Sequence, residues 1–310
     1  MDITNRISLG DRLDRWVFKK CFRVGWPLLA LRLILARRIV WSPVTWLHHC
    51  WPTPTVTNTS SSVESISRRE GYRLFAPGTF VELSEIVAAC REIFNRHQAE
   101  ITDSTRFNKP YFYNILTAED LKQHPILMNF ALSAAVIEAV TDYLGQTPRL
   151  HSIGVFYSAV NDSIDGSQMY HVDGDALSQI KCFVNVWDVG AGGGAFTFLP
   201  KRLSSISLRS KGLLKAIADE EVARLLPEAD QIKVVGSAGS GVFVDTSRCL
   251  HQGSRARTHP RLVFQFQYVT RPDALLTQPG REVAGGHLLV TRQLLGGLSL
   301  TNPQAMLFVN

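Results

Sequence analysis

Six short strand-like runs with Gly-rich turns dominate the second half of the chain and restrict its fold. They lie at residues 151–160, 180–189, 195–200, 231–236, 240–246 and 261–269. A helical pattern at residues 212–227 separates the third run from the fourth, but strands and helices do not alternate regularly, as they would in a doubly wound parallel sheet. The pattern therefore predicts an antiparallel sandwich or barrel.

Two predicted helices precede these strands. Residues 83–97 carry apolar side chains at helical spacing, and a second helix is predicted over residues 125–144, ending at Gly145. A first strand is expected at residues 71–75. With 310 residues, of which 45% are hydrophobic and 19% charged, the chain is long enough for a sizeable core. We expect a mainly β fold with flanking helices.

The first 51 residues differ in kind from the rest. They hold nine Lys or Arg against three Asp, which accounts for the whole net charge of +6, and five of the six Trp. Their longest apolar run, residues 24–36, is too short to span a bilayer and contains Arg32. This composition predicts an amphipathic segment that binds an anionic membrane surface without crossing it. The alternatives are that the segment packs on the folded domain or that it is an Arg-rich targeting peptide.

The predicted organisation has three further parts. Residues 52–67 are rich in Ser, Thr and Pro and are predicted to be a linker, residues 68–271 form the main domain, and residues 272–310 form a C-terminal extension. The five Cys are scattered without a C-x-x-C pair, which argues against a disulfide framework or a thiolate zinc site and favours a reducing compartment. We expect a cytoplasmic protein, peripheral on the inner face of a membrane, and nothing indicates a nucleic-acid partner.

The stretch YHVDGD contains a candidate metal-binding pair. His171 and Asp173 lie two residues apart, so in an extended chain their side chains point to one face and can share an ion. The pair alone is a weak motif, and Asp175 competes with Asp173. His251, which follows the run 240–246, is the candidate third ligand. Two imidazoles and one carboxylate leave coordination positions open, which suits Fe(II) better than a closed structural zinc site.

A candidate anion-binding residue follows ten residues after His251. Arg261 opens the strand RLVFQFQYV, whose alternation puts Arg261 on one face and the apolar side chains on the other. A guanidinium there can form a bidentate pair with the far carboxylate of a dicarboxylic acid. Arg255 and Arg257 compete for this role, but they lie in a loop in which solvated charge is the default.

Residues 170–200 and 241–269 resemble the phytanoyl-CoA dioxygenase-like family of Fe(II)- and 2-oxoglutarate-dependent oxygenases. A fainter likeness extends from Gly71 to Tyr268. The resemblance implies a double-stranded β-helix, which is a jelly-roll or cupin-like core. It further implies that His171, Asp173 and His251 bind iron and that Arg261 anchors 2-oxoglutarate. The expected cofactors are Fe(II), 2-oxoglutarate and O2, with ascorbate as a stimulant, and the expected reaction is hydroxylation of a C–H bond in a small-molecule or lipid-like substrate.

The sequence departs from the family at two places. Pro200 is followed by Lys201, Arg202 and Leu203 where many relatives have Gly-Ser-His, which affects contacts on the substrate side. Val263 occupies a place where some 2-oxoglutarate enzymes carry a hydroxyl group. A second contact to the cosubstrate must therefore come from elsewhere, and Lys109 and Tyr157 are the candidates.

Two classes of function remain open at this stage. The first is the oxygenase. The second is a non-catalytic metal-binding β-helix module that binds or senses a ligand, because a fold does not guarantee its chemistry.

Overall fold

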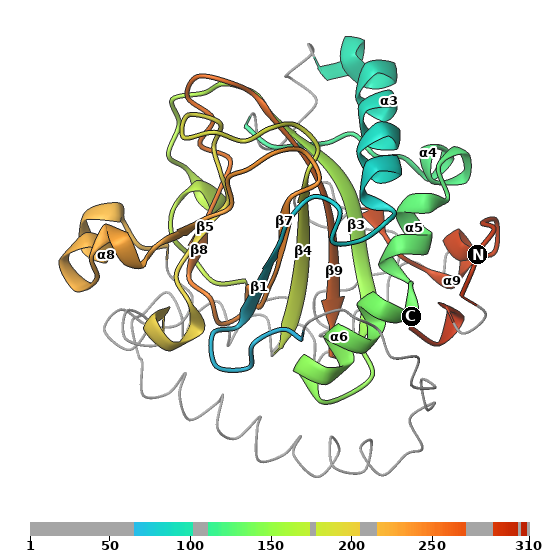
Figure 1. Ribbon diagram of the computed structural model, residues 1–310. Coiled ribbons are helices and arrows are strands. Elements are labelled where there is room, and N and C mark those ends of the chain that lie inside the picture. The colour runs from blue at the N-terminus through green and yellow to red at the C-terminus, as the bar shows by residue number, and fades with distance from the viewer. Residues whose placement is uncertain are drawn as a thin grey trace, which may run out of the picture. The chain divides into compact units, whose positions relative to one another are not determined.

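A large antiparallel sheet lies at the centre of the domain (Figure 1). The computed structural model describes residues 65–101, 111–173, 178–204, 216–270, 288–302 and 305–308. The order of strands in the sheet is β1-β7-β4-β9-β3-β10, with β2 beside β3. The strands are β1 (Tyr72–Phe75), β2 (Tyr113–Asn114), β3 (Arg149–Ser158), β4 (Gln179–Asn185), β7 (Gly241–Val244), β9 (Arg261–Val269) and β10 (Leu288–Leu289).

A smaller sheet has the order β6-β5-β8, formed by β6 (Ile232–Lys233), β5 (Thr197–Phe198) and β8 (His251–Gln252). Its edge is extended by His171, which forms an antiparallel bridge with His251, and the preceding residue Tyr170 forms a bridge with Ile217. From β3 onwards the chain therefore crosses repeatedly between the two sheets: β3, β4, β7 and β9 belong to the large sheet, and the segments between them to the small one. This winding is that of a double-stranded β-helix, and the predicted fold class is confirmed.

Each face of the large sheet has its own apolar cluster. On one face the side chains of Phe183, Val242 and Val263 pack against Phe196 and Phe198 of the small sheet. On the other face Leu262, Phe264 and Phe266 join the main core beneath the helices. The alternation in β9 predicts this division, because successive side chains of a strand point to opposite faces. Each buried side chain of this size stabilises the fold by about 1.5–3 kcal/mol.

Helices cover the second face of the large sheet (Figure 1). They are α3 (Leu83–Ile101), α4 (Ala118–Gln123), α5 (Ile126–Ala131) and α6 (Ala134–Leu144). Two further helices come later in the sequence, α8 (Asp219–Leu225) and α9 (Arg292–Leu295). The short 3-10 helices are η2 (Gly166–Gln168), η3 (Glu228–Asp230) and η4 (Ala305–Phe308). The first predicted helix is confirmed as α3. The prediction of one helix over residues 125–144 is wrong, because the extended residue Ser133 interrupts it and its side chain caps α6. The predicted end at Gly145 is confirmed, with φ of 70° in the left-handed region.

The stretch Ile126–Leu144 is long and apolar enough to cross a membrane, judged by length and composition alone. Its most apolar window has a mean hydropathy of 1.3, but 56% of that window is buried inside the protein. Leu127, Phe130 and Val140 belong to the main core. In the described part of the chain this apolar stretch therefore serves the packing of the domain.

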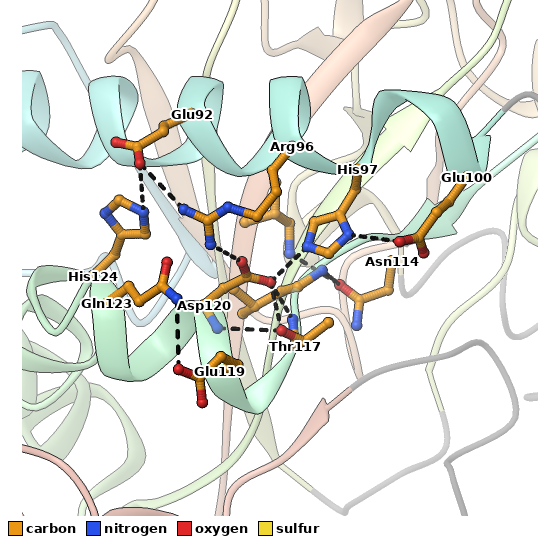
Figure 2. A network of polar contacts seen from close by, with 12 residues as sticks. Glu92, Arg96, His97, Glu100, Asn114, Thr117, Glu119, Asp120, Gln123 and His124 are labelled. Atoms are coloured by element: carbon orange, nitrogen blue, oxygen red, sulfur yellow. Dashed lines mark hydrogen bonds and ion pairs between the residues drawn. The ribbon is translucent and has the colours of Figure 1, made fainter.

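A polar network joins α3 to the start of α4 (Figure 2). The buried carboxylate of Asp120 accepts hydrogen bonds from Arg96 Nη1 at 2.7 Å and from the Thr117 hydroxyl at 2.6 Å. The Thr117 amide also donates to Asp120, and the Asp120 amide donates back to the Thr117 hydroxyl, so the two residues form a capping box. His97 Nε2 lies 2.9 Å from Asp120 Oδ2. One carboxylate thus caps α4 and fixes its position on α3.

The predicted N-terminal segment lies outside the described residues, whereas part of the predicted C-terminal extension is described. Residues 1–51 and most of the predicted linker lie outside the described residues, although Ile66 is buried in the core. The predicted C-terminal extension contributes to the domain: β10 pairs with β3, and Val290, Leu295 and Phe308 are buried in the main core.

Candidate metal centre

The two histidines of the candidate site rise from one pair of backbone segments. His171 and His251 are opposite each other, and each amide donates to the other's carbonyl at 2.9 Å. Directly paired residues project their side chains to the same face, and the ring centroids are 4.3 Å apart. The Asp173 amide donates to the Thr246 carbonyl at 2.9 Å, which ties the third residue to the end of β7. The main chain therefore brings the three residues together.

The three side chains offer ligand atoms that all lie within 4.8 Å of one another. His171 Nε2 is 3.7 Å from Asp173 Oδ1, and His251 Nε2 is 3.7 Å from Asp173 Oδ2. Each histidine places Nδ1 beside the carbonyl two residues before it, Met169 for His171 at 2.8 Å and Cys249 for His251 at 2.9 Å. A carbonyl only accepts, so Nδ1 carries the proton and Nε2 presents its lone pair to the cluster.

The charges in the cluster favour binding of a cation. Burial opposes ionisation of Asp173, but the ammonium group of Lys181 beside it, the largest of the opposing effects, helps to hold the pKa of this carboxyl well below its usual range. Burial, followed by the neighbouring His171, lowers the pKa of His251 to about 3. At neutral pH the cluster therefore contains a carboxylate and a neutral His251, which are the forms that bind metals.

Two side chains of β4 hold the Asp173 carboxylate. Lys181 Nζ is 2.8 Å from Asp173 Oδ2, and Gln179 Nε2 donates to the same oxygen at 3.2 Å. Both side chains are buried. The sequence analysis missed them, although a Lys within the apolar run IKCFVNV was a usable signal, because a buried Lys requires a partner.

Arg261 lies at the start of β9 and is buried with 3% exposure. Its Nη1 donates to the Gly194 carbonyl at 2.6 Å, whereas Nε has no partner among the described residues. A side chain at Gly253, two residues after His251, would come within 4.0 Å of Arg261 Nη1, so the guanidinium lies beside the segment that carries His251. Burial lowers the pKa of Arg261 to about 10, and the group stays cationic at neutral pH.

The two competing arginines have other partners. Arg255 donates to the Gln168 carbonyl at 2.6 Å and forms an ion pair with Asp219. Arg257 donates to the Asn161 carbonyl at 2.5 Å. Both arginines therefore hold the segment that follows β3, and Arg261 is the candidate for an anion.

The structure does not bring Tyr157 to this site, so that prediction needs correction. The Tyr157 ring contacts Phe94 of α3 and Trp187, with centroids 5.3 Å and 6.1 Å apart. It thus lies on the helix-covered face of the large sheet, while Asp173 and Lys181 meet on the other face. Strand alternation is the reason, since a neighbour in sequence points the opposite way. Lys109 and Asp175 lie outside the described residues.

Comparison with known proteins gives structural likenesses only. No protein-family model and no curated protein matches the sequence. The epimerase SnoN from nogalamycin biosynthesis, a non-heme alpha ketoglutarate dependent enzyme, is 20% identical over 73% of this chain and 93% of its own, with a TM-score of 0.44. EctD from S. alaskensis, solved with 2-oxoglutarate and 5-hydroxyectoine, is 14% identical over 70% of this chain and 80% of its own, with a TM-score of 0.43.

Proposed function

We propose that this protein is an Fe(II)- and 2-oxoglutarate-dependent oxygenase that hydroxylates a C–H bond of a small-molecule or lipid-like substrate. The observation that carries the proposal is the convergence of His171, Asp173 and His251 on one face, with a buried Arg261 nearby. Two imidazoles and one carboxylate suit Fe(II) and leave positions open for a chelating cosubstrate and O2. The residues present therefore fit this metal and this class of cosubstrate.

Each residue of the cluster has a defined task. His171 and His251 would bind the metal through Nε2, because their Nδ1 atoms donate to backbone carbonyls. Asp173 would supply the negative ligand atom. When bound, such a centre couples the oxidative decarboxylation of 2-oxoglutarate to succinate with oxidation of the substrate by O2. Arg261 would bind the distal carboxylate of the cosubstrate, and this provides a partner for its buried Nε.

Ser158 is the proposed second contact to that carboxylate. It lies directly opposite Arg261 in the β3–β9 pairing, so the two side chains share the face that carries the metal cluster. Ser158 is 2% exposed, and its hydroxyl has no hydrogen bond to the described residues. A hydroxyl beside a guanidinium can donate to the same carboxylate. The signal in the sequence was the alternation of β3, which places Ser158 and Tyr157 on opposite faces.

Succinate release tests the proposal. Purified protein with Fe(II), ascorbate, O2 and labelled 2-oxoglutarate should release succinate, since the cosubstrate site and the metal site are both built from this chain. His251→Ala should abolish release, while Arg257→Ala should retain it. If the wild-type protein binds Fe(II) but releases no succinate with or without candidate substrates, the non-catalytic binding module replaces the oxygenase.

A further inference from the structure

The two oxygens of the Asp173 carboxylate are in different surroundings. Oδ2 is contacted by Lys181 Nζ at 2.8 Å and by Gln179 Nε2 at 3.2 Å. Oδ1 accepts no hydrogen bond from the described residues. Each oxygen lies 3.7 Å from one histidine Nε2, Oδ1 from His171 and Oδ2 from His251, so the two donors are what distinguish them. A carboxylate whose one oxygen is held by two donors presents the other to a metal, which favours binding through a single oxygen.

Gln179 is itself held by a directional chain across three strands. Ser152 Oγ on β3 donates to Gln267 Oε1 on β9 at 3.2 Å, and Gln267 Nε2 donates to Gln179 Oε1 on β4 at 3.1 Å. Gln179 Nε2 then donates to Asp173 and, at 2.7 Å, to Thr246 Oγ1. Every amide oxygen in the chain accepts and every amide nitrogen donates toward the carboxylate, so the orientation of each amide depends on the one before it.

The three residues of this hydrogen-bond chain are buried, so reversing the orientation of its amides costs free energy. Ser152 is 1% exposed, Gln267 3% and Gln179 0%. A buried polar group that loses its partner pays the desolvation cost without compensation. If Gln267 were removed, the Gln179 carbonyl would lose its donor, and the Gln179 amide would be free to turn its oxygen toward Asp173.

We propose that Ser152, Gln267 and Gln179 form a positioning chain which, together with Lys181, fixes Asp173 as a ligand through one oxygen. The inference rests on the proposed function, since it assigns Asp173 to a metal. These residues touch neither the metal nor the cosubstrate in this assignment. They act through Asp173 by fixing which of its oxygens is free.

Gln265 provides a matched control for Gln267. Both residues lie on β9, two positions apart and on the same face, and both are 3% exposed. Gln265 makes no hydrogen bond to the described residues, whereas Gln267 is the middle member of the chain. Replacement of either by Met keeps the length of the side chain and removes the amide.

The test is metal affinity measured on the folded full-length protein. Binding of Mn(II) can be followed by the electron paramagnetic resonance signal of the free ion. The affinity for Mn(II) should fall roughly 10-fold in Gln267→Met, as expected for loss of a group that orients a metal ligand. In Gln265→Met it should stay within about 2-fold of wild type. The absorption spectrum of bound Co(II) should change in Gln267→Met alone, because Gln179 then loses the donor that orients its amide and Oδ2 keeps Lys181 as its one oriented donor, so the carboxylate can shift at the metal. A loss of stability without repositioning would leave that spectrum unchanged.

Several outcomes contradict the proposal, each in a different way. Equal Mn(II) affinity and Co(II) spectra in wild type and Gln267→Met would show that the chain has no positioning role, while the proposed function stands. An equal loss in Gln265→Met would make the effect a general property of the sheet interior. Failure of the wild-type protein to bind either ion would overturn the metal assignment itself. If Gln267→Met does not fold, Ser152→Ala removes the first donor of the chain and should weaken Mn(II) binding in the same direction, and wild-type affinity there would contradict the proposal.

Discussion

His171 and His251 exchange both of their backbone hydrogen bonds although they are eighty residues apart in the chain. The distance between the two imidazoles is therefore set by the pairing of the main chain, and the rings need little rotational freedom to converge. The carbonyls of Met169 and Cys249 fix the ring orientation in turn. A site built in this way should be largely formed before a metal binds.

Metal binding should therefore stabilise the fold measurably. Mn(II) at about 100 times its dissociation constant should raise the free energy of unfolding by roughly 2.7 kcal/mol, because the ion binds the native state and not the unfolded chain. Thermal denaturation with and without the ion measures this shift. In His251→Ala the shift should vanish, and an undiminished shift there would place the ion elsewhere.

Asp173 and Lys181 should be energetically coupled in the metal-free protein. Asp173→Ala should cost roughly 3 kcal/mol, since it removes the carboxylate that the buried ammonium group of Lys181 contacts at 2.8 Å. Adding Lys181→Met should recover part of that loss, and chemical denaturation of both single variants and the double variant measures the coupling. The exposed pair Lys233 and Glu228, with its N–O distance of 2.7 Å, is the control and should show no measurable coupling. Additive losses at Asp173 and Lys181 would contradict the prediction.

Arg261→Ala should separate binding of the cosubstrate from binding of the metal. The affinity for 2-oxoglutarate should fall by roughly 2–4 kcal/mol, the cost of removing one member of a buried charge pair, while Mn(II) remains bound. Calorimetric titration of the Mn(II)-loaded protein measures this change. Arg257→Ala is the comparison, because its guanidinium is bound to the segment after β3. If Arg257→Ala gives the larger loss, Arg261 is the wrong anchor.

Asp120→Asn should destabilise the protein by about 2 kcal/mol at pH 7, since a buried carboxylate loses its charge in a network of donors. Burial opposes ionisation of Asp120, but the hydrogen bonds from Thr117 and the nearby His97 lower its pKa below the usual value. A lowered folded-state pKa gives stability that is present above pH ~4 and is lost as the pH falls through that pKa. The difference between wild type and variant should therefore narrow below pH ~4 in urea denaturation.

The exposed neighbour Glu119 is the control for Asp120. Glu119→Gln should leave the stability at pH 7 nearly unchanged, because its partner Lys122 is also exposed. If the two variants lose the same stability, the network in Figure 2 does not act through Asp120.

The sequence predicts features that depend on the local pattern within one strand. It does not predict contacts that depend on how the strands pair. The alternation of β9 predicted the faces of Arg261 and Phe264, and the i, i+2 spacing predicted His171 with Asp173. The partners of Asp173 were not predicted, since Gln179 and Lys181 reach it only through the register of β4. The sequence names Tyr157 as a cosubstrate contact but does not show which residues of β3 lie opposite β9. The register pairs Tyr157 with Leu262 on the helix-covered face and Ser158 with Arg261 on the face of the metal cluster.

The basic, Trp-rich residues 1–51 are predicted to bind anionic membrane surfaces, and they lie outside the described residues. Full-length protein should sediment with vesicles that contain phosphatidylserine, and less so at high salt, because screening weakens attraction between the basic side chains and the lipid headgroups. A variant that begins at Val63 keeps Ile66, which is buried in the core, and should stay in the supernatant while retaining succinate release. Vesicles of neutral phosphatidylcholine are the control for purely apolar adsorption. If the shortened protein misfolds, or if the full-length protein ignores anionic vesicles at low salt, the segment packs on the domain instead.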